Sequence, residues 1–141
     1  MIVGELTQVL LTYGNTHEIL KNPKMSKSGY ANKHHWVASI KPKEVRYRQI
    51  FDKLLEKVVF ELDPGFAKPL RHVKPEQGEC SLSINGWGDF TLEMHLKFKD
   101  YEKVCGGNIT IYHELCFKNG GKFKEVAIEF DKKWLDEIMS K

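Results

Sequence analysis

Eight consecutive residues in the second half of the chain alternate strictly between polar and apolar side chains, and this pattern constrains the fold most. From Thr91 to Phe98 every second residue is apolar, namely Leu92, Met94, Leu96 and Phe98. Side chains on a β-strand point alternately to opposite faces, so the pattern predicts a strand with one buried face and one exposed face. Half-buried strands of this kind are typical of antiparallel sheets.

Further segments carry the same signal. Residues 34–40 place Trp36, Ala38 and Ile40 on one face, and residues 126–130 alternate in the same way. Residues 57–62 form a β-branched, strand-like run, which Asp63-Pro64-Gly65 ends because proline lacks a backbone donor. Gly106-Gly107 is predicted to start another strand, which carries Ile109 and Ile111.

Two glycine-containing segments resemble turns. A short apolar segment, residues 5–12, is followed by Tyr13-Gly14-Asn15, which we interpret as the turn that closes the first strand. Asn119-Gly120-Gly121 has the composition of a hairpin turn. Residues 22–33 contain proline, serine, glycine and asparagine and are predicted to form a loop.

Helical spacing appears in only two places. Residues 47–55 indicate a helical turn, and the tail predicts a short helix with Asp131 as its N-cap. The tail carries an apolar stripe at helical spacing: Trp134, Leu135, Ile138 and Met139. This stripe either packs back on the sheets or docks on a partner. We expect an all-β sandwich or small barrel over residues 1–130, followed by the helix at 131–141.

Composition agrees with one ordinary domain. The chain has 141 residues, 41% of them hydrophobic and 29% charged. It contains no run of apolar residues long enough to span a membrane, and its first residues form a poor signal peptide. Three cysteines without a CxxC pair favour a reducing compartment.

The net charge of +3 is unevenly distributed. Residues 21–48 contain eight basic residues and one acidic residue, so that this segment carries +7 and the rest of the chain carries −4. Such asymmetry indicates either a polyanionic partner or a solvated, lysine-rich loop.

Catalytic and metal-binding motifs are missing from the sequence. It contains no GxSxG, GxxxxGK[ST], GxGxxG or HExxH segment. The adjacent His34 and His35 would point to opposite faces of a strand and are poorly placed to share a metal ion. We therefore expect no enzyme, no metal site and no cofactor.

One segment stands out as a candidate ligand-binding element. Two glycines bracket a tryptophan in Gly86-Trp87-Gly88-Asp89-Phe90, directly before the clearest strand. Small neighbours expose the indole face, and glycine permits close approach of a ligand to the backbone. A glycine-containing β-bulge with the tryptophan packed on the sandwich explains the same residues.

Five segments in order resemble the YEATS domain, a family of acyl-lysine readers in chromatin proteins. They are Tyr13-Gly14-Asn15, His34-His35-Trp36-Val37, residues 58–71, Gly86-Trp87-Gly88-Asp89-Phe90 and Ile111-Tyr112-His113-Glu114-Leu115. The resemblance spans residues 6 to about 131. It implies an immunoglobulin-like sandwich of about eight antiparallel strands, with a binding site in the loops at one end.

The resemblance also implies which residues form that site. Phe66 and Trp87 would be the two aromatic faces between which an acylated lysine lies. The backbone from Gly86 to Gly88 would donate to the acyl carbonyl, Phe90 would support the tryptophan loop, and His34 begins the strand beside it. A pocket open at both ends would admit acetyl and longer flat groups such as crotonyl.

Three pocket positions depart from the family pattern. Where the family has an LHxS turn, this chain has Asp63 in place of the histidine and Gly65 in place of the serine. A third position, usually aromatic or histidine, is Asn32. The missing serine hydroxyl removes one hydrogen bond to the lysine amide, which costs about 1 kcal/mol, or about fivefold in affinity. Asp63 or Asn32 would be alternative acceptors.

These observations lead to two hypotheses. The first is a nuclear reader that binds an acylated histone tail, with H3 as the expected tail. It would act within a chromatin-remodelling, acetyltransferase or transcription complex, with non-specific DNA contact through Lys21, Lys24, Lys27 and Lys33. The second is a pocket-degenerate scaffold of the same fold that acts as a protein-interaction module. Neither hypothesis involves a membrane.

Overall fold

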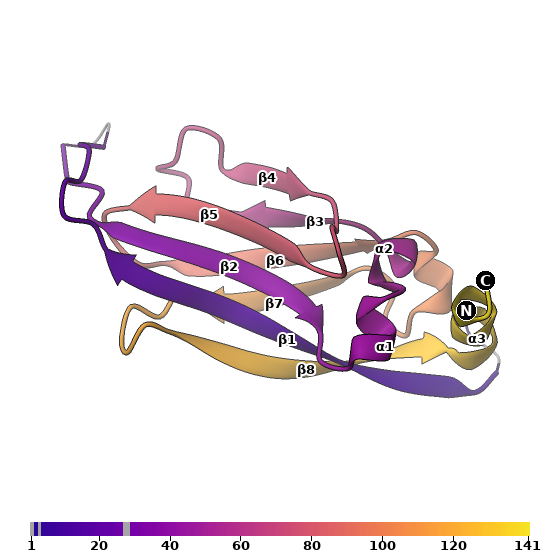
Figure 1. The fold of residues 1–141 in the computed structure, drawn as a ribbon. Coiled ribbons are helices and arrows are strands. Elements are labelled where there is room, and N and C mark those ends of the chain that lie inside the picture. The colour runs from indigo at the N-terminus through magenta and orange to yellow at the C-terminus, as the bar shows by residue number, and fades with distance from the viewer. Residues whose placement is uncertain (1, 3, 27–28) are drawn as a thin grey trace.

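The computed structural model describes residues 2, 4–26 and 29–141, and these fold into two packed four-stranded antiparallel sheets (Figure 1). The first sheet has the order β5-β2-β1-β8, and the second has the order β4-β3-β6-β7. The strands of the first sheet are β1 (Leu6–Ile19), β2 (His34–Pro42), β5 (Cys80–Gly86) and β8 (Gly121–Asp131). Those of the second sheet are β3 (Leu55–Glu61), β4 (Leu70–Val73), β6 (Thr91–Phe98) and β7 (Ile109–Glu114). The predicted all-β sandwich is confirmed.

The alternating segments behave as the sequence predicts. β6 has the bounds expected from its pattern, and Leu92, Met94 and Leu96 are fully buried on its inner face. Trp36, Ala38 and Ile40 of β2 face them from the first sheet and are equally buried. Because each sheet contributes its apolar face to one core, the outer faces and the loops at the ends remain for binding.

The first predicted turn is wrong. Tyr13-Gly14-Asn15 lies inside β1, which continues to Ile19 and pairs with both β2 and β8. Gly14 is required there by close packing, since a Cβ at this position would meet the Lys122 carbonyl oxygen and lie 2.7 Å from the Phe123 Cα. Glycine therefore marks a close approach of two strands, which composition alone does not distinguish from a turn.

The predicted hairpin at residues 119–121 is a turn of another kind. Asn119 and Gly120 both have positive φ, as the composition indicates. The strands on either side of this turn are β7 and β8, which belong to different sheets. The turn therefore carries the chain from one layer of the sandwich to the other.

Helices occupy the connection after β2 and the C-terminal tail. The predicted helical turn at 47–55 consists of α1 (Val45–Arg48) and α2 (Phe51–Leu54), and a 3₁₀ turn, η1 (Tyr101–Lys103), precedes β7. The tail forms α3 (Lys132–Met139), where the Asp131 carboxylate accepts the backbone N–H of Trp134 at 3.1 Å as the N-cap. Leu135 is buried in the common core. Within the described residues, no helix has the length and apolar character needed to cross a membrane.

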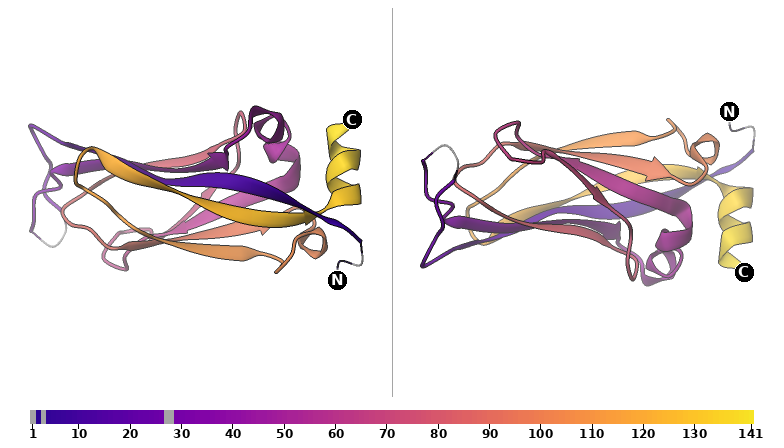
Figure 2. Two further views of the ribbon diagram at one scale, coloured as in Figure 1. Left: turned by 90° about the horizontal axis from the view of Figure 1, so that it is seen from below. Right: turned by 90° about the horizontal axis from the view of Figure 1, so that it is seen from above.

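The two ends of the sandwich differ in what they carry. Helices α1, α2 and α3 and both termini lie at one end, and the long β1–β2 connection lies at the other end (Figures 1 and 2). The β3–β4 and β5–β6 connections reach the same end as the β1–β2 connection (Figure 1). Three loops that are distant in sequence therefore gather where a binding site can form.

Candidate functional site

A cavity of about 290 Å³ lies among the three gathered loops. Each of these loops contributes to its wall: the β1–β2 loop, the β3–β4 loop and the β5–β6 loop. The lining residues are Met25, Ser26, Asn32, Asp63, Gly65, Phe66, Ala67, Asn85, Trp87, Gly88, Asp89 and Phe90. Seven of the nine residues predicted to bind the acylated lysine are among them, whereas Gly86 and His34 are not.

Trp87 is held by an aromatic partner from another loop. Its indole stacks on the ring of Tyr30, with centroids 4.8 Å apart and planes at 25°. Tyr30 does not line the cavity and Trp87 does, so we infer that Tyr30 covers the face of the indole that is turned away from the cavity. Stacked aromatic pairs contribute about 0.5–1.5 kcal/mol beyond area burial, so Tyr30 orients the half-exposed indole.

Phe66 is connected to the core through aromatic contacts. Its ring lies 5.6 Å from that of Phe90, and Phe90 in turn makes an edge contact with buried Trp36 at 5.9 Å. The ring contacts of Phe90 are thus with Phe66 and Trp36, which connects this wall of the cavity to the core.

The two glycines beside Trp87 differ in their surroundings. A Cβ at Gly86 would lie 3.4 Å from the Phe66 ring, so the absence of a side chain there leaves space for Phe66. Gly88 has nothing within 4 Å of the equivalent position and is open to the cavity. Gly86 therefore acts through packing, and Gly88 leaves its backbone accessible.

The Asp63 carboxylate closes the β3–β4 turn. Its Oδ2 accepts the backbone N–H of Gly65 at 2.9 Å, and its backbone carbonyl accepts the N–H of Phe66 at 3.0 Å. Aspartate side chains commonly stabilise turns through such local hydrogen bonds. Asp63, one of the three predicted departures from the family pattern, thus fixes the backbone that carries Phe66.

His34 belongs to a neighbouring histidine pair. Its Nδ1 lies 2.8 Å from Nε2 of His17, and both imidazoles stack on Phe117 with centroids 4.4 Å apart. Desolvation lowers the pKa of both His17 and His34. The charge of a neighbouring histidine lowers each pKa further, His35 acting on His17 and His17 acting on His34. His34 pairs in register with Gly86 on β5, so the histidine pair lies next to the strand end that precedes Trp87.

A buried polar network joins the sheets near this end. The Oδ1 of Asn15 accepts the Cys116 N–H at 3.0 Å and lies 2.7 Å from His113 Nε2, while Asn15 Nδ2 donates to the Cys116 carbonyl at 2.9 Å. Because Asn15 Oδ1 is an acceptor, His113 carries its hydrogen on Nε2. Asn15 and His113 are both almost completely buried, and desolvation lowers the pKa of His113.

The basic segment divides between the two ends of the molecule. Lys41 and Lys43 pair with Glu79 and Glu125 at 3.8 and 2.9 Å, away from the cavity. Lys21, Lys24 and Lys33 are exposed on the β1–β2 loop and form no ion pair within the described part of the chain. The remaining predicted DNA contact, Lys27, lies outside the described residues.

Comparison with known proteins identifies the family to which this fold belongs. A sequence model of the YEATS family matches residues 31–119, more than half of the chain. The chain belongs to the YEATS family. The match contains all three pocket departures and both predicted aromatic faces.

One curated relative and several solved structures resemble this YEATS domain. Transcription initiation factor TFIID subunit 14b of Arabidopsis thaliana is 36% identical over 62 residues, which cover 44% of this chain and 22% of that protein. The matched part is therefore about a fifth of the relative's length. The YEATS domain of Yaf9 bound to H3K27ac is 21% identical, with a TM-score of 0.69 over 100% of this chain and 99% of that one.

Two further solved structures have the same fold. The Yaf9 YEATS domain that recognises an H3K122suc peptide aligns at a TM-score of 0.68 and 21% identity, covering 100% of this chain and 99% of that one. Yeast Yaf9, described as a homologue of AF-9, aligns at 0.68 and 20% identity, covering 97% and 89% of the two chains. At these identities the likeness establishes the sandwich fold.

Sequence reasoning missed residues of the β1–β2 loop that line the cavity or support its wall. Tyr30 stacks on Trp87, and Met25 lines the cavity from the same loop. Tyr30 follows a glycine, as Trp87 does, and this exposed aromatic was the one available signal. Tyr30 and Trp87 are 57 positions apart and lie in different loops, so no local sequence pattern predicts their contact.

Proposed function

We propose that this YEATS domain binds an acylated lysine, and that the side chain enters the cavity between Phe66 and Trp87. The observation that carries this proposal is that both aromatic residues, from separate loops, line one open cavity. Each is held by further aromatic packing, Trp87 by Tyr30 and Phe66 by Phe90.

The chemistry of an acylated lysine matches this cavity. Acylation removes the ammonium charge and leaves a flat amide that stacks on aromatic rings. The amide also needs hydrogen-bond partners to replace water, because an unpaired polar group is costly to bury. The backbone beside Gly88 would donate to the acyl carbonyl, and Asn32 is a lining residue able to accept from the amide N–H.

The missing serine hydroxyl would weaken binding without preventing it. Gly65 lines the cavity and has no side chain to offer. One hydrogen bond to a neutral group contributes about 1 kcal/mol, whereas stacking on two aromatic faces contributes comparable or larger amounts. We therefore expect a weaker reader rather than a scaffold whose pocket is lost.

The partner follows from the same proposal. Relatives of this fold are described as bound to acylated histone H3 peptides, and a relative in sequence is a transcription factor subunit. An acylated H3 tail is therefore the proposed ligand, and a chromatin or transcription complex in the nucleus is the proposed setting. The function is that of a reader, and no step in it requires catalysis.

Calorimetric titration of H3 peptides tests this proposal. Acetyl-lysine and crotonyl-lysine peptides should bind, and the matched unmodified peptide should not. Trp87→Ala and Phe66→Ala should abolish binding, while Trp134→Ala on α3 serves as the control because it changes an aromatic at the opposite end. No binding of either acylated peptide at about 1 mM would reject the reader and favour the scaffold.

A further inference from the structure

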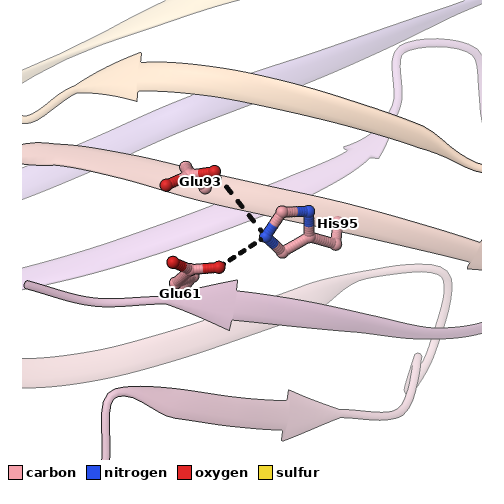
Figure 3. A group of neighbouring side chains, drawn as sticks. All are labelled: Glu61, Glu93 and His95. Carbon is pink, nitrogen blue, oxygen red and sulfur yellow. Dashed lines mark hydrogen bonds and ion pairs between the residues drawn. The ribbon is translucent and has the colours of Figure 1, made fainter. Parts of the chain in front are cut away.

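The outer face of the second sheet carries a cluster of three metal-binding side chains that the proposed function does not use. Glu61 lies on β3, and Glu93 and His95 lie on β6, with one ligand atom of each within 4.8 Å of the others (Figure 3). Glu61 and Glu93 are direct cross-strand partners, and His95 follows Glu93 by two residues. Register therefore places all three on one face.

The histidine of this cluster is already oriented toward the carboxylates. Its Nε2 lies 3.0 Å from Glu61 Oε1 and 3.8 Å from Glu93 Oε1, as Figure 3 shows. Its other nitrogen, Nδ1, lies 2.8 Å from the hydroxyl of Thr110 on β7. A metal-binding histidine is held in orientation by a hydrogen bond that its second ring nitrogen donates, here Nδ1–H to the Thr110 hydroxyl oxygen.

Two opposed carboxylates without a strong cation are unusual on a sheet. Like charges directly opposite one another on neighbouring strands are destabilising. Within the described part of the chain, neither Glu61 nor Glu93 pairs with a lysine or arginine, and the imidazole of His95 lies 3.0 Å from one and 3.8 Å from the other. A bound divalent cation would neutralise both carboxylates.

We propose that Glu61, Glu93 and His95 form a binding site for a zinc-type divalent transition metal. Tetrahedral zinc with ligands about 2.1 Å away has ligand atoms roughly 3.4 Å apart. The two measured separations, 3.0 and 3.8 Å, lie on either side of that value, so small side-chain rotations complete the geometry. Water supplies the fourth ligand.

The donor set excludes the commoner hard cations. Calcium takes six to eight oxygen ligands, and magnesium requires octahedral oxygen coordination. One imidazole and two carboxylates suit zinc and related ions. Sequence spacing did not indicate this site because its ligands come from two strands. Glu61 and Glu93 are 32 positions apart in the sequence.

A bound ion would link the strands that lead to the pocket. Glu61 is the last residue of β3, directly before the turn that carries Asp63 and Phe66. Glu93 lies near the start of β6, just after the Trp87 segment. The ion would thus fasten the two strand ends from which these cavity loops extend.

Metal titration of the intact chain tests the site directly. Zinc, measured by competition with a chromophoric chelator, should bind at one ion per chain, and cobalt should give the visible absorption of a tetrahedral centre. His95→Asn, Glu61→Gln or Glu93→Gln should each lower the zinc affinity at least about 100-fold. Thr110→Val should lower it about 10-fold, and Thr110→Ser should restore it.

Matched controls lie on the same face. Glu114→Gln and His72→Asn remove a carboxylate and an imidazole from exposed positions of β7 and β4 and should leave the affinity unchanged. Circular dichroism checks that each variant is folded. Zinc binding that survives His95→Asn would place the ion elsewhere and overturn the proposal. Absence of zinc binding to about 1 mM would show that the cluster is an ion pair only.

Discussion

At the scale of single residues, Asp63 is a predicted departure from the family pattern that stabilises its own loop. Asp63 accepts the Gly65 N–H at 2.9 Å and so fixes the turn beside Phe66. From the sequence alone, the resemblance predicted Phe66 and Trp87 as the aromatic faces and named the three departures from the family pattern. Sequence alone did not indicate that Tyr30 would stack on Trp87, because that contact depends on how two loops meet.

The first prediction concerns the missing hydroxyl. Gly65→Ser restores the family's donor and acceptor at the cavity wall, so acyl-peptide affinity should increase about fivefold. Gly65→Ala is the matched control, because both variants place a Cβ 3.0 Å from the Asp63 carboxylate. Calorimetry with a crotonyl-lysine peptide measures the change. Equal affinities of the serine and alanine variants would contradict the assigned role.

The second prediction concerns acid stability. Desolvation lowers the pKa of buried His113 below its ordinary value, so between the folded pKa and about 6.5 the unfolded chain binds more protons. The free energy of unfolding should therefore be at its full value above about pH 6.5 and fall as the pH drops through the folded pKa. One such group contributes at most about 1.4 kcal/mol per pH unit.

Urea unfolding at several pH values separates His113 from the other titrating groups. His17 and His34 shift in the same direction and remain present in a His113→Gln variant. That variant should be less stable at pH 7.5 and should lose less stability on acidification than the parent. An unchanged pH dependence would show that His113 does not contribute.

At the scale of elements, alternation predicts strands and says little about their partners. β6 and β2 followed from strict patterns that coincide with their buried faces. β1 was cut short because Gly14 resembles a turn, and the short β4 and serine-rich β5 gave no clear expectation. Long-range pairing decided the case of β1, since Gly14 is needed where β8 approaches it.

The third prediction tests that close approach. Gly14→Ala places a Cβ against the Lys122 carbonyl and the Phe123 backbone, so β1 and β8 must separate. We expect a loss of about 1–3 kcal/mol in the free energy of unfolding, as for other overpacked sites. Gly88→Ala adds the same methyl group to open space and should be nearly neutral. Urea denaturation of both variants measures the difference, and equal stability would contradict this packing account.

At the scale of the whole molecule, the sandwich separates two kinds of surface. The cavity and the exposed lysines Lys21, Lys24 and Lys33 share the end formed by the loops. The opposite end carries the helices, and Lys41 and Lys43 are paired with acids away from the cavity. The segment count showed that residues 21–48 carry +7, and the ion pairs of Lys41 and Lys43 show that this charge is divided between the two ends.

The fourth prediction concerns nucleic-acid contact. Reversing Lys21, Lys24 and Lys33 to glutamate should weaken duplex DNA binding and reduce the slope of log affinity against log salt by about 3. The same reversal at Lys41 and Lys43 should have little effect, since both lysines already pair with acids. Fluorescence anisotropy at several salt concentrations measures both. Loss of DNA binding in the second variant alone would contradict the proposed surface.

The most direct test of the central proposal is a nuclear magnetic resonance titration of the intact domain with a crotonyl-lysine H3 peptide. The indole N–H of Trp87 and the backbone amides of Phe66 and Gly88 should shift, because these three residues line the cavity. The indole of Trp134, on α3 at the other end, should not move. The unmodified peptide should leave all of these resonances in place. Unchanged Trp87 and Phe66 resonances at saturating crotonyl peptide would contradict acyl-lysine binding in this cavity.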